Sequence, residues 1–419
     1  MATGDAKDGA RPRVVIIGAG FAGLAAVREL AGSGADVTLV DRNVYSTFQP
    51  LLYQVATGGL NPGDVAYSVR GFLRNRDAHF RHGTVSTVDH AARKILFEAG
   101  GALEYDYLLI SIGVNVNHFG IPGAHEHSRG LYTRADAIAL RDELMGALER
   151  YATGRGPDQL AVVIVGGGAT GVEMAGTLAE LRTAGLANAY PEINPARVRV
   201  ILVEMAGDLL GPFHPKLRAY ALKELRRRHV DVRLNTAIAE VQADEVVLSD
   251  GERLPSNMTV WAAGVSAPSY LADWGLPQRE GGRLAVGPDL RVDGHDRIFA
   301  AGDIARIDGQ VLPQVAQPAL QAGAHFAGQI KRIMAGRPLE AFRYHDKGSM
   351  ATIGRGAAVV EMSDGRFRVT GVPAWLAWLA LHIVTLLGGR NRISALLNLS
   401  WRYLAWPSGS GVIVGDVKE

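Results

Sequence analysis

Residues 13–26 read RVVIIGAGFAGLAA and decide the fold of this chain. The run of β-branched residues at 14–17 predicts a buried parallel strand, and an alanine-rich helix is expected after it. Between the two, Gly18, Gly20 and Gly23 have the spacing of a nucleotide-binding turn. In such a turn the first glycine permits the tight bend, the second lets the backbone approach a pyrophosphate, and the third lets helix and strand pack closely.

An acidic residue follows at the expected place. The apolar run 37–40 predicts the next strand and ends in Asp41, where a carboxylate accepts hydrogen bonds from an adenosine ribose. Strand, turn, helix, strand and acid in this order favour a dinucleotide-binding fold over an unrelated glycine-rich turn.

Composition excludes several kinds of protein. The chain has 419 residues, enough for two or three domains. Its net charge of +2 does not indicate nucleic-acid binding. It contains no cysteine, which excludes disulfides, thiolate metal sites, Fe–S clusters and redox-active dithiols. Residues 1–11 mix glycine with both charge signs and are expected to be a disordered tail, not a signal peptide, so we expect a cytoplasmic catalytic body.

The nucleotide-binding pattern occurs a second time. Residues 160–165 read LAVVIV, a second glycine turn spans 166–171, a helix is expected from 172, and the strand 198–203 ends in Glu204. The interval before Glu204 is longer than in the first copy, and a loop inserted at 186–195 explains it. Two such folds in one chain predict two bound dinucleotides.

The two acids bear on which nucleotides bind. A carboxylate at Glu204 suits a free ribose 2′-hydroxyl and repels a 2′-phosphate, so the second fold is expected to prefer NADH over NADPH. Asp41 suits the adenosine end of FAD equally well.

The rest of the chain contributes further expected elements. Strands are expected at 85–88, 94–97, 105–113, 260–265 and 297–303, and helices at 135–150 and 315–334. The segment 43–54 shows no helical periodicity and is expected to be an ordered loop that either lines a flat ring or serves as a packed connector.

Two polar features follow the later strands. Asp303 ends the strand 297–303 and is either a turn residue or a contact to ribityl hydroxyls. Gln317 and Gln321 lie one turn apart on the helix that follows. They form either a polar stripe or part of a helix N-terminus directed at a flavin pyrimidine, where it would stabilise negative charge on the reduced ring.

With these motifs placed, the sequence resembles type II NADH dehydrogenase, the single-subunit NADH:quinone oxidoreductase, from about residue 14 to 406. The most specific matching segments are FQPLLYQVA at 48–56, VWAAGV at 260–265, AGD at 301–303, AQPALQAG at 316–323 and KGSMATIGR at 347–355.

The resemblance implies FAD in the first fold, NADH in the second, and a quinone near Gln317 and Gln321. It implies hydride transfer from NADH to FAD and two electrons passed to a membrane quinone, without proton pumping. Neither glutamine is an acid at neutral pH, so both are expected to position or hydrogen-bond the quinone.

Glu173 matches a family glutamate near the nicotinamide that takes part in substrate or proton handling, although a glutamate in a first helical turn is often only a dipole partner. The candidate catalytic residues are therefore Glu173, Gln317 and Gln321. The candidate cofactor-binding residues are Gly18, Gly20, Phe21, Ala22, Gly23, Asp41, Arg42, Gln49, Gly113, Gly166, Gly168, Thr170, Gly171, Glu173, Glu204, Ala263, Gly264, Gly302, Asp303, Ala316 and Gln317.

The C-terminal region is apolar in a way that suits a membrane surface. Residues 373–387 are apolar almost all round, but at about 1.5 Å per residue they fall short of a ~30 Å hydrocarbon core. The next stretch places apolar residues at helical spacing, with two arginines available for lipid phosphates and four tryptophans suited to an interface. These residues are Ile393, Leu396, Leu397, Trp401 and Leu404, then Arg392 and Arg402, then Trp375, Trp378, Trp401 and Trp406.

We therefore expect two helices lying in one leaflet, with affinity for anionic lipid. A buried hairpin or dimer interface is the alternative, and a single membrane span is a weaker third choice.

The predicted fold class is α/β, with two Rossmann-like dinucleotide-binding domains and C-terminal amphipathic membrane-anchoring helices. The expected boundaries are 12–120 with 283–340 for FAD, 121–282 for NADH, and 341–419 for the membrane-associated region. The expected location is peripheral, on the cytoplasmic face of the inner membrane. A homodimer is possible, and neither a bound metal nor a bound nucleic acid is expected.

Rival functions are a flavin-bearing regulatory protein of the apoptosis-inducing-factor type and a ferredoxin or rubredoxin reductase. Sulfide:quinone oxidoreductase and the disulfide reductases need cysteines, which this chain lacks.

Overall fold

A computed structural model describes residues 11–156 and 159–405 of the chain. The chain forms two compact units. The first comprises Met1–Ser46, Tyr67–Asn115 and Ser266–Asp346, and the second comprises Thr47–Ala66, Val116–Val265 and Lys347–Glu419. Most of the predicted tail, residues 1–10, lies outside the described residues.

The first unit is built on a five-stranded parallel sheet with the order β21-β9-β1-β2-β5. These strands are β1 (Arg13–Ile17), β2 (Asp36–Asp41), β5 (Ala78–His82), β9 (Tyr107–Ile110) and β21 (Ile298–Ala300). Residues 14–17 of β1 are all buried, as the β-branched run predicts. The expected strands at 37–40, 105–113 and 297–303 are thus confirmed at their cores.

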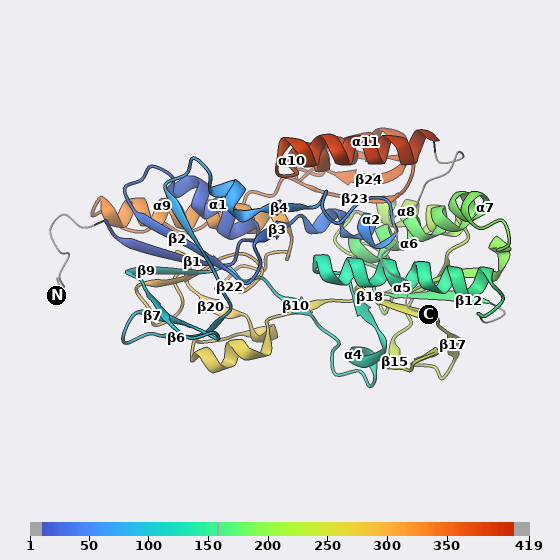
Figure 1. Cartoon of the computed structure of the whole chain (residues 1–419), viewed down its shortest axis with the longest axis horizontal. Helices are drawn as coiled ribbons and strands as arrows, with labels where there is room; N and C mark the ends of the chain where they lie inside the picture. The colour runs from blue at the N-terminus through green and yellow to red at the C-terminus, as the bar shows by residue number, and fades with distance from the viewer. Residues whose placement is uncertain (1–10, 157–158, 406–419) are drawn as a thin grey trace. The chain divides into compact units, whose positions relative to one another are not determined.

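Two helices of this unit pack closely, α1 (Phe21–Leu30) and α9 (Ala316–Met334) (Figure 1). A Cβ at Gly323 would lie 2.0 Å from the carbonyl oxygen of Ala22, so only glycine permits this approach. The predicted helix at 315–334 is confirmed. The other elements of this unit are α3 (Val69–Leu73), β6 (Val85–Asp89), β7 (Lys94–Phe97), β8 (Ala102–Glu104), η4 (Ser269–Trp274), η5 (Glu280–Gly282), β20 (Leu284–Val286) and β22 (Ala305–Ile307).

The second unit repeats the plan. Its parallel sheet has the order β11-β18-β12-β13-β14, so β18, β12, β13 and β14 take the places of β9, β1, β2 and β5. The strands are β11 (Arg129–Gly130), β12 (Leu160–Val165), β13 (Val198–Val203), β14 (Asp231–Arg233) and β18 (Met258–Trp261). All six residues of β12 are buried. The predicted duplication is therefore confirmed in topology.

Helices and an antiparallel sheet complete the sides of this unit. The helices are α4 (Ala124–His127), α5 (Arg134–Ala152), α6 (Ala169–Glu180), α8 (Pro215–Arg227) and the 3₁₀ turn η3 (Pro195–Arg197), and the sheet is β15 (Ile238–Val241), β16 (Glu245–Leu248) and β17 (Arg253–Pro255). The predicted helix at 135–150 corresponds to α5, which begins with a capping box formed by Thr133 and Asp136. Short strands at the boundaries between the units are β3 (Tyr45–Thr47), β4 (Ala66–Ser68), β10 (Asn115–Val116) and β19 (Val265–Ser266).

Two predicted loops are partly helical. Within 43–54 the chain forms the 3₁₀ turn η1 (Gln49–Leu51) and continues as α2 (Leu52–Ala56), whose five residues are all buried. A helix this short shows no periodicity in sequence, which is why the prediction was wrong. Within 186–195 the chain forms α7 (Leu186–Ala189), and the π-helical turn η2 (Leu181–Gly185) joins α7 to α6.

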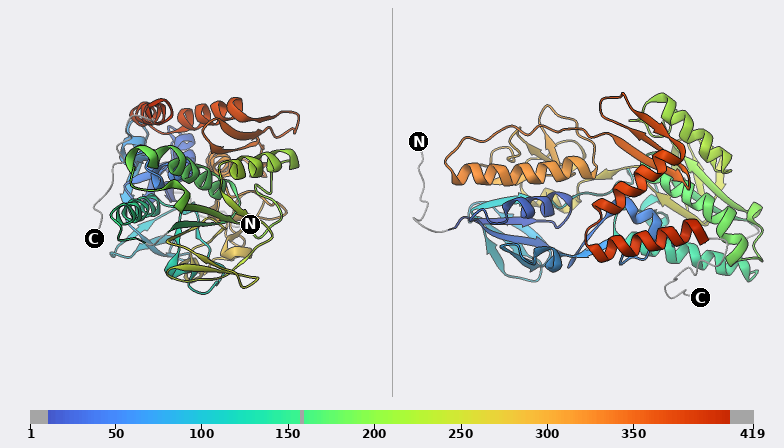
Figure 2. Two further views of the ribbon diagram at one scale, coloured as in Figure 1. Left: turned by 90° about the vertical axis from the view of Figure 1, so that its right-hand side faces the viewer. Right: turned by 90° about the horizontal axis from the view of Figure 1, so that it is seen from above.

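The C-terminal part of the second unit consists of an antiparallel sheet and two helices. The sheet is β23 (Ser349–Gly354), β24 (Ala357–Glu361) and β25 (Arg368–Thr370), and the helices are α10 (Gly371–Thr385) and α11 (Gly389–Ala405). Figures 1 and 2 show α10 and α11 in red as neighbouring helices. Across the part of the chain that the structure describes, every helix is too short or too polar to cross a bilayer.

The compact units group the chain differently from the predicted domain boundaries at several places. Residues 266–282, predicted as part of the NADH domain, belong to the first unit. Segments 47–66 and 347–419 belong to the second unit, whereas the prediction put the first with the FAD domain and treated the second as a separate region. The boundaries drawn by cofactor stay a prediction.

Candidate functional site

The first glycine turn, between β1 and α1, is fixed by backbone contacts. Gly18 has φ +104°, and a Cβ there would lie 2.3 Å from the carbonyl oxygen of Ser111. A Cβ at Gly23 would lie 1.9 Å from the carbonyl oxygen of Gly18, whereas one at Gly20 would meet nothing within 4 Å. The outer glycines are therefore needed for packing, and Gly20 leaves open space for a ligand against the backbone.

The second turn, between β12 and α6, repeats these distances. Gly166 has φ +109° and its Cβ would lie 2.6 Å from the carbonyl oxygen of Ala262. The Cβ of residue 171 would lie 1.9 Å from the carbonyl oxygen of Gly166, and that of residue 168 would again meet nothing within 4 Å. Both helices begin at a glycine without a side-chain cap, so their first N–H groups face the open side of the turn.

Each turn is closed by the acid of the following strand. Asp41 Oδ2 accepts from the N–H of Ala19 at 2.6 Å, and Glu204 Oε2 accepts from the N–H of Gly167 at 2.5 Å. Burial raises the pKa of Asp41, and the N–H groups of Ala19 and Asn43 oppose that rise. The acids thus lie at the edge of the turns, where the predicted ribose contact requires them.

The first unit also holds the Gly302–Asp303 turn after β21 and the start of α9. A pocket there is lined by Arg283, Gly302, Asp303 and Pro318, among others. Arg283 Nε donates to the carbonyl oxygen of Asp303 at 2.8 Å, which fixes the turn. The strand end and the helix start that were predicted to contact a flavin therefore lie together.

The two glutamines of α9 differ in their surroundings. Gln317 is half-buried in the first turn of the helix. Gln321 donates to the carbonyl oxygen of His345 at 2.9 Å and accepts from its N–H at 3.0 Å. The side-chain amide of Gln321 is thus bonded to the backbone on both sides, so of the two, Gln317 is the better candidate for a quinone contact.

Glu173 is a buried carboxyl on α6, only 8% exposed. Its Oε1 accepts from the backbone N–H of Thr352 at 3.3 Å. Burial raises the pKa of Glu173 to about 8, and the Thr352 N–H and the Trp378 indole oppose the rise. A carboxyl with a pKa near neutrality can both hold and release a proton at working pH.

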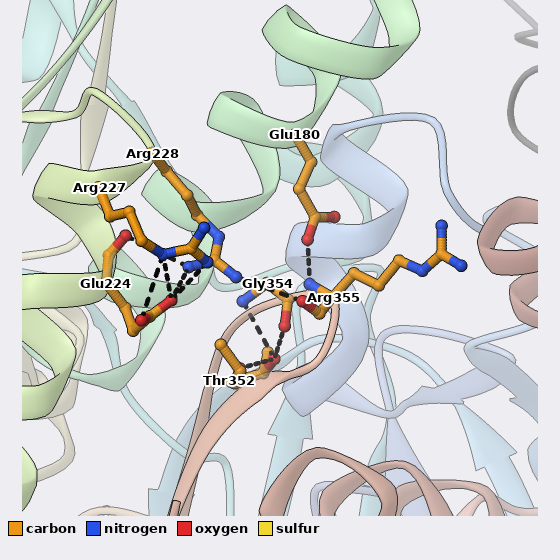
Figure 3. A network of polar contacts seen from close by, with 8 residues as sticks. Glu180, Glu224, Arg227, Arg228, Thr352, Gly354 and Arg355 are labelled. Carbon is orange, nitrogen blue, oxygen red and sulfur yellow. Dashed lines mark hydrogen bonds and ion pairs between the residues drawn. The ribbon is translucent and has the colours of Figure 1, made fainter. Parts of the chain in front are cut away.

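The turn between β23 and β24 is fixed against α6 and α8 (Figure 3). Glu180 accepts from the N–H of Arg355, and Arg228 donates to the Arg355 carbonyl oxygen at 3.2 Å. Gly354 has φ +124°, and a Cβ there would lie 2.5 Å from Glu180 Oε1. Since β23 also carries Thr352, this strand is held to α6 at both Glu173 and Glu180.

Helix α11 bonds to segment 54–66 of the same unit through polar side chains. Asp64 accepts from Ser394 at 2.6 Å and from Asn398 at 2.8 Å. Arg402 donates to Gln54 Oε1 at 2.6 Å. Sequence reasoning did not identify Asp64, Ser394 or Asn398, and it expected Arg402 to face lipid.

Comparisons with known proteins agree with this geometry. Residues 12–323 match the family model described as "Pyridine nucleotide-disulphide oxidoreductase". The type II NADH:quinone oxidoreductase NdhA of Mycobacterium tuberculosis is 38% identical, with 98% of this chain and 91% of that protein covered.

The chain belongs to the type II NADH:quinone oxidoreductase family.

Solved structures share the fold of this flavin-dependent oxidoreductase family. The structure of NDH2 from Plasmodium falciparum in complex with NADH has a TM-score of 0.87 at 19% identity, with 96% of this chain and 100% of that chain covered. The sulfide:quinone oxidoreductase of Aquifex aeolicus has a TM-score of 0.76 at 20% identity, with 93% of each chain covered.

Most of the other cofactor-binding residues predicted for this family member lie on the two turns or beside them. Phe21 and Ala22 begin α1, Thr170 begins α6, Ala316 begins α9, Arg42 follows β2, Gly113 follows β9, and Ala263 and Gly264 follow β18. A Cβ at Gly166 would lie 2.7 Å from Ala263 Cα, which places that residue against the second turn. Gln49 lies in η1, and its Oε1 is buried without a hydrogen-bond partner in the described part of the chain.

Two side chains predicted to face lipid are buried instead. Arg402 is 4% exposed and Trp378 is 1% exposed. Arg402 is bonded to Gln54, and Trp378 packs against Tyr53 with ring centroids 6.1 Å apart. The sequence could not show this because both partners lie more than 300 positions away along the chain. Trp406 lies outside the described residues.

Proposed function

We propose that this chain oxidises NADH and passes the electrons to a membrane quinone, with FAD bound at the first glycine turn and NADH at the second. The observation that carries this proposal is the duplicated turn, in which two open glycines, two uncapped helix starts and two acids recur at matching positions. The name of a relative adds the quinone, since the M. tuberculosis protein, 38% identical, is named a NADH:quinone oxidoreductase.

The residues of the first turn fit the adenosine and pyrophosphate of FAD. Gly20 leaves room at the backbone, and Asp41 lies at the ribose end. The turn of Gly302 and Asp303 in the same unit supplies a further carboxylate, which we assign to the hydroxyls of the ribityl chain. Bound there, FAD would supply the two-electron chemistry that links NADH oxidation to quinone reduction.

Glu204 supports NADH over NADPH in the second turn. Its carboxylate lies against Gly167 and accepts from the N–H groups of Gly167 and Ala206. A 2′-phosphate would approach this negative charge, whereas a 2′-hydroxyl donates to it.

The C-terminal helices support a peripheral attachment to a membrane surface. Both α10 and α11 expose several large apolar side chains. These are Val372, Leu376, Leu381, Val384, Ile393, Leu396, Leu397 and Trp401, each at least 42% exposed. Exposed apolar surface of this kind is the usual mark of an interaction site, and the quinone acceptor is itself dissolved in the bilayer. We propose the cytoplasmic face of the inner membrane and attraction to anionic lipid through Arg390 and Arg392, both exposed.

Protons for quinone reduction need a donor in the protein. Glu173 is our candidate, because it holds a proton near neutral pH at a buried position. Gln317 is the candidate hydrogen-bonding residue for the quinone, and it orients without exchanging a proton.

Steady-state turnover tests the proposal. Purified protein is supplied with NADH and a short-chain quinone, and NADH absorbance is followed. We expect sustained oxidation that depends on quinone, whereas a single turnover followed by a long-lived reduced complex would favour a regulatory flavoprotein. Protein that stays colourless after incubation with FAD would contradict the cofactor assignment.

A further inference from the structure

The face of α11 that packs on its own unit combines polar side chains with buried apolar ones such as Ala395 and Leu399. The positions 391, 394, 398 and 402 recur every three or four residues and share one face. All four side chains on this face bond to segment 54–66 of the same unit, while large apolar residues lie on the other face. The apolar residues are Ile393, Leu396, Leu397 and Trp401, between 45% and 62% exposed.

The polar face, residues 391, 394, 398 and 402, makes contacts along about three turns of the helix. Asn391 donates to the carbonyl oxygen of Ala66 at 2.8 Å. Ser394 and Asn398 donate to the two carboxylate oxygens of Asp64, which is 7% exposed. Further along, Arg402 donates to Gln54 Oε1. Four hydrogen bonds, three of which involve a charged group, hold this face of α11 to the segment.

Gly59 makes room for the buried guanidinium. A Cβ at this position would lie 1.7 Å from Arg402 Nη1 and 2.4 Å from Gln54 Oε1. The backbone of Gly59 does not have a positive φ, so the glycine is needed here for space and not for conformation. The N–H of Gly59 also donates to the Gln54 carbonyl oxygen at 2.7 Å, which closes the turn around the guanidinium.

The segment that α11 holds begins inside helix α2, and α2 connects it to Glu173. Helix α2 packs against α6, which carries Glu173. Tyr53 of α2 is fully buried, contacts Trp378, and lies close enough to Glu173 and Arg402 to respond to both charges. A displacement of α2 would therefore change the surroundings of Glu173.

We propose that α11 is a polar latch that positions α2 for quinone reduction, with Arg402 and Asp64 as its positioning residues. This rests on the function proposed above. The latch acts through α2, so it affects the step in which the quinone accepts electrons and protons and not the step in which NADH delivers them. A bilayer against the exposed apolar face of α11 would restrict the motion of the helix, and the latch is then firmer on the membrane than in solution.

Gly59→Ala is the sharpest test, because it displaces the guanidinium of Arg402 and keeps every charge. Gly63→Ala is the matched control, since Gly63 lies in the same segment, has no positive φ, and its Cβ would meet nothing within 4 Å. The full chain with its flavin is placed on vesicles that contain quinone, and rapid mixing separates flavin reduction by NADH from reoxidation by quinone.

We expect Gly59→Ala and Arg402→Gln to slow reoxidation about tenfold or more, as breaking one hydrogen bond to a charged group predicts. Reduction by NADH should stay within about twofold, and Gly63→Ala should match the native protein in both steps. Arg402→Lys keeps the charge and one donor, so it should recover part of the reoxidation rate.

Hydrogen exchange gives a second measurement that does not depend on turnover. The amides of Thr57 and Gly59, which donate to Tyr53 and Gln54 at 3.1 and 2.7 Å, should exchange faster in Gly59→Ala than in Gly63→Ala. Vesicles should slow their exchange in the native protein.

The outcomes separate the two proposals. Native protein without quinone-dependent turnover would contradict the proposed function. Native turnover with an unchanged reoxidation rate in Gly59→Ala, or with both steps slowed equally, would overturn the positioning role of the latch.

Discussion

The two glycine turns are nearly the same in their backbones and different in the helices that follow them. A Cβ at Gly23 or at Gly171, the third glycine of each motif, would lie 1.9 Å from a carbonyl oxygen. A Cβ at the second motif glycine, residue 20 or 168, would meet nothing within 4 Å. Two residues after the third glycine, α1 has Ala25, 2% exposed, and α6 has Glu173, 8% exposed. Nine residues after it, the first copy has Gly32 and the second has Glu180.

The difference shows which part of the repeat is common and which part is specific. Nucleotide binding depends on the turn, so the turn is kept in both copies. The small residues of α1 allow close packing against α9. Helix α6 instead carries a buried carboxyl, Glu173, and a half-buried one, Glu180, which bond to Thr352 and Arg355 of the β23–β24 hairpin. Proton chemistry is therefore assigned to the second copy alone.

The largest effect is expected from replacing the first glycine of each turn. Alanine at residue 18 or 166 would combine a positive φ with a Cβ closer than 3 Å to backbone atoms. Gly18→Ala should lose its flavin colour, and Gly166→Ala should keep it and bind NADH at least about tenfold more weakly. Flavin absorbance and NADH titration check this, and equal loss of flavin in both variants would show that the two turns are not separate sites.

Glu173→Gln tests the carboxyl that only the second copy has. The amide keeps the shape and removes the proton, so quinone-dependent reoxidation should fall about 100-fold, in the range of general acid catalysis. Flavin reduction by NADH, measured separately by rapid mixing, should change much less. A reoxidation rate like that of the native protein would make Glu173 a structural residue.

The same substitution should alter how stability depends on pH. Burial raises the pKa of Glu173 from 4.5 to about 8, so the folded state holds this proton more tightly than the unfolded state. The free energy of unfolding therefore falls as the pH rises from 4.5 to about 8. The native protein should lose about 1.4 kcal/mol per pH unit relative to Glu173→Gln between pH 6 and 7.5. Denaturant unfolding at several pH values measures the difference, and parallel curves would contradict it.

The smallest effect is expected at the acid of the second turn. Glu204→Gln removes the charge that opposes a 2′-phosphate, and the preference for NADH over NADPH should fall by about three- to tenfold. The ratio of kcat/KM for the two nucleotides is the measurement, with Asp208→Asn, an exposed acid nearby in sequence, as the control. An unchanged ratio would show that Glu204 does not contact the ribose.

Local patterns predicted the sheets and turns, and distant contacts escaped prediction. The strands at 13–17 and 160–165 and their glycines follow from residues adjacent in sequence. The apolar face of α11 was also predicted, because it repeats within one helix. The polar face was not predicted, since the hydrogen-bond partners of Asn391 and Arg402 lie in segment 54–66, far away in the sequence. Arg402 was accordingly expected at the lipid surface and is buried.

The bond between Gln54 and Arg402 joins residues 348 positions apart. At about 5 to 20 residues per second on the ribosome, α2 emerges roughly 20 to 70 s before its partner helix exists. The second unit therefore cannot finish folding until residue 402 has been synthesised. A prematurely terminated chain would present α2 uncovered, and cellular proteases could recognise it by that exposed segment.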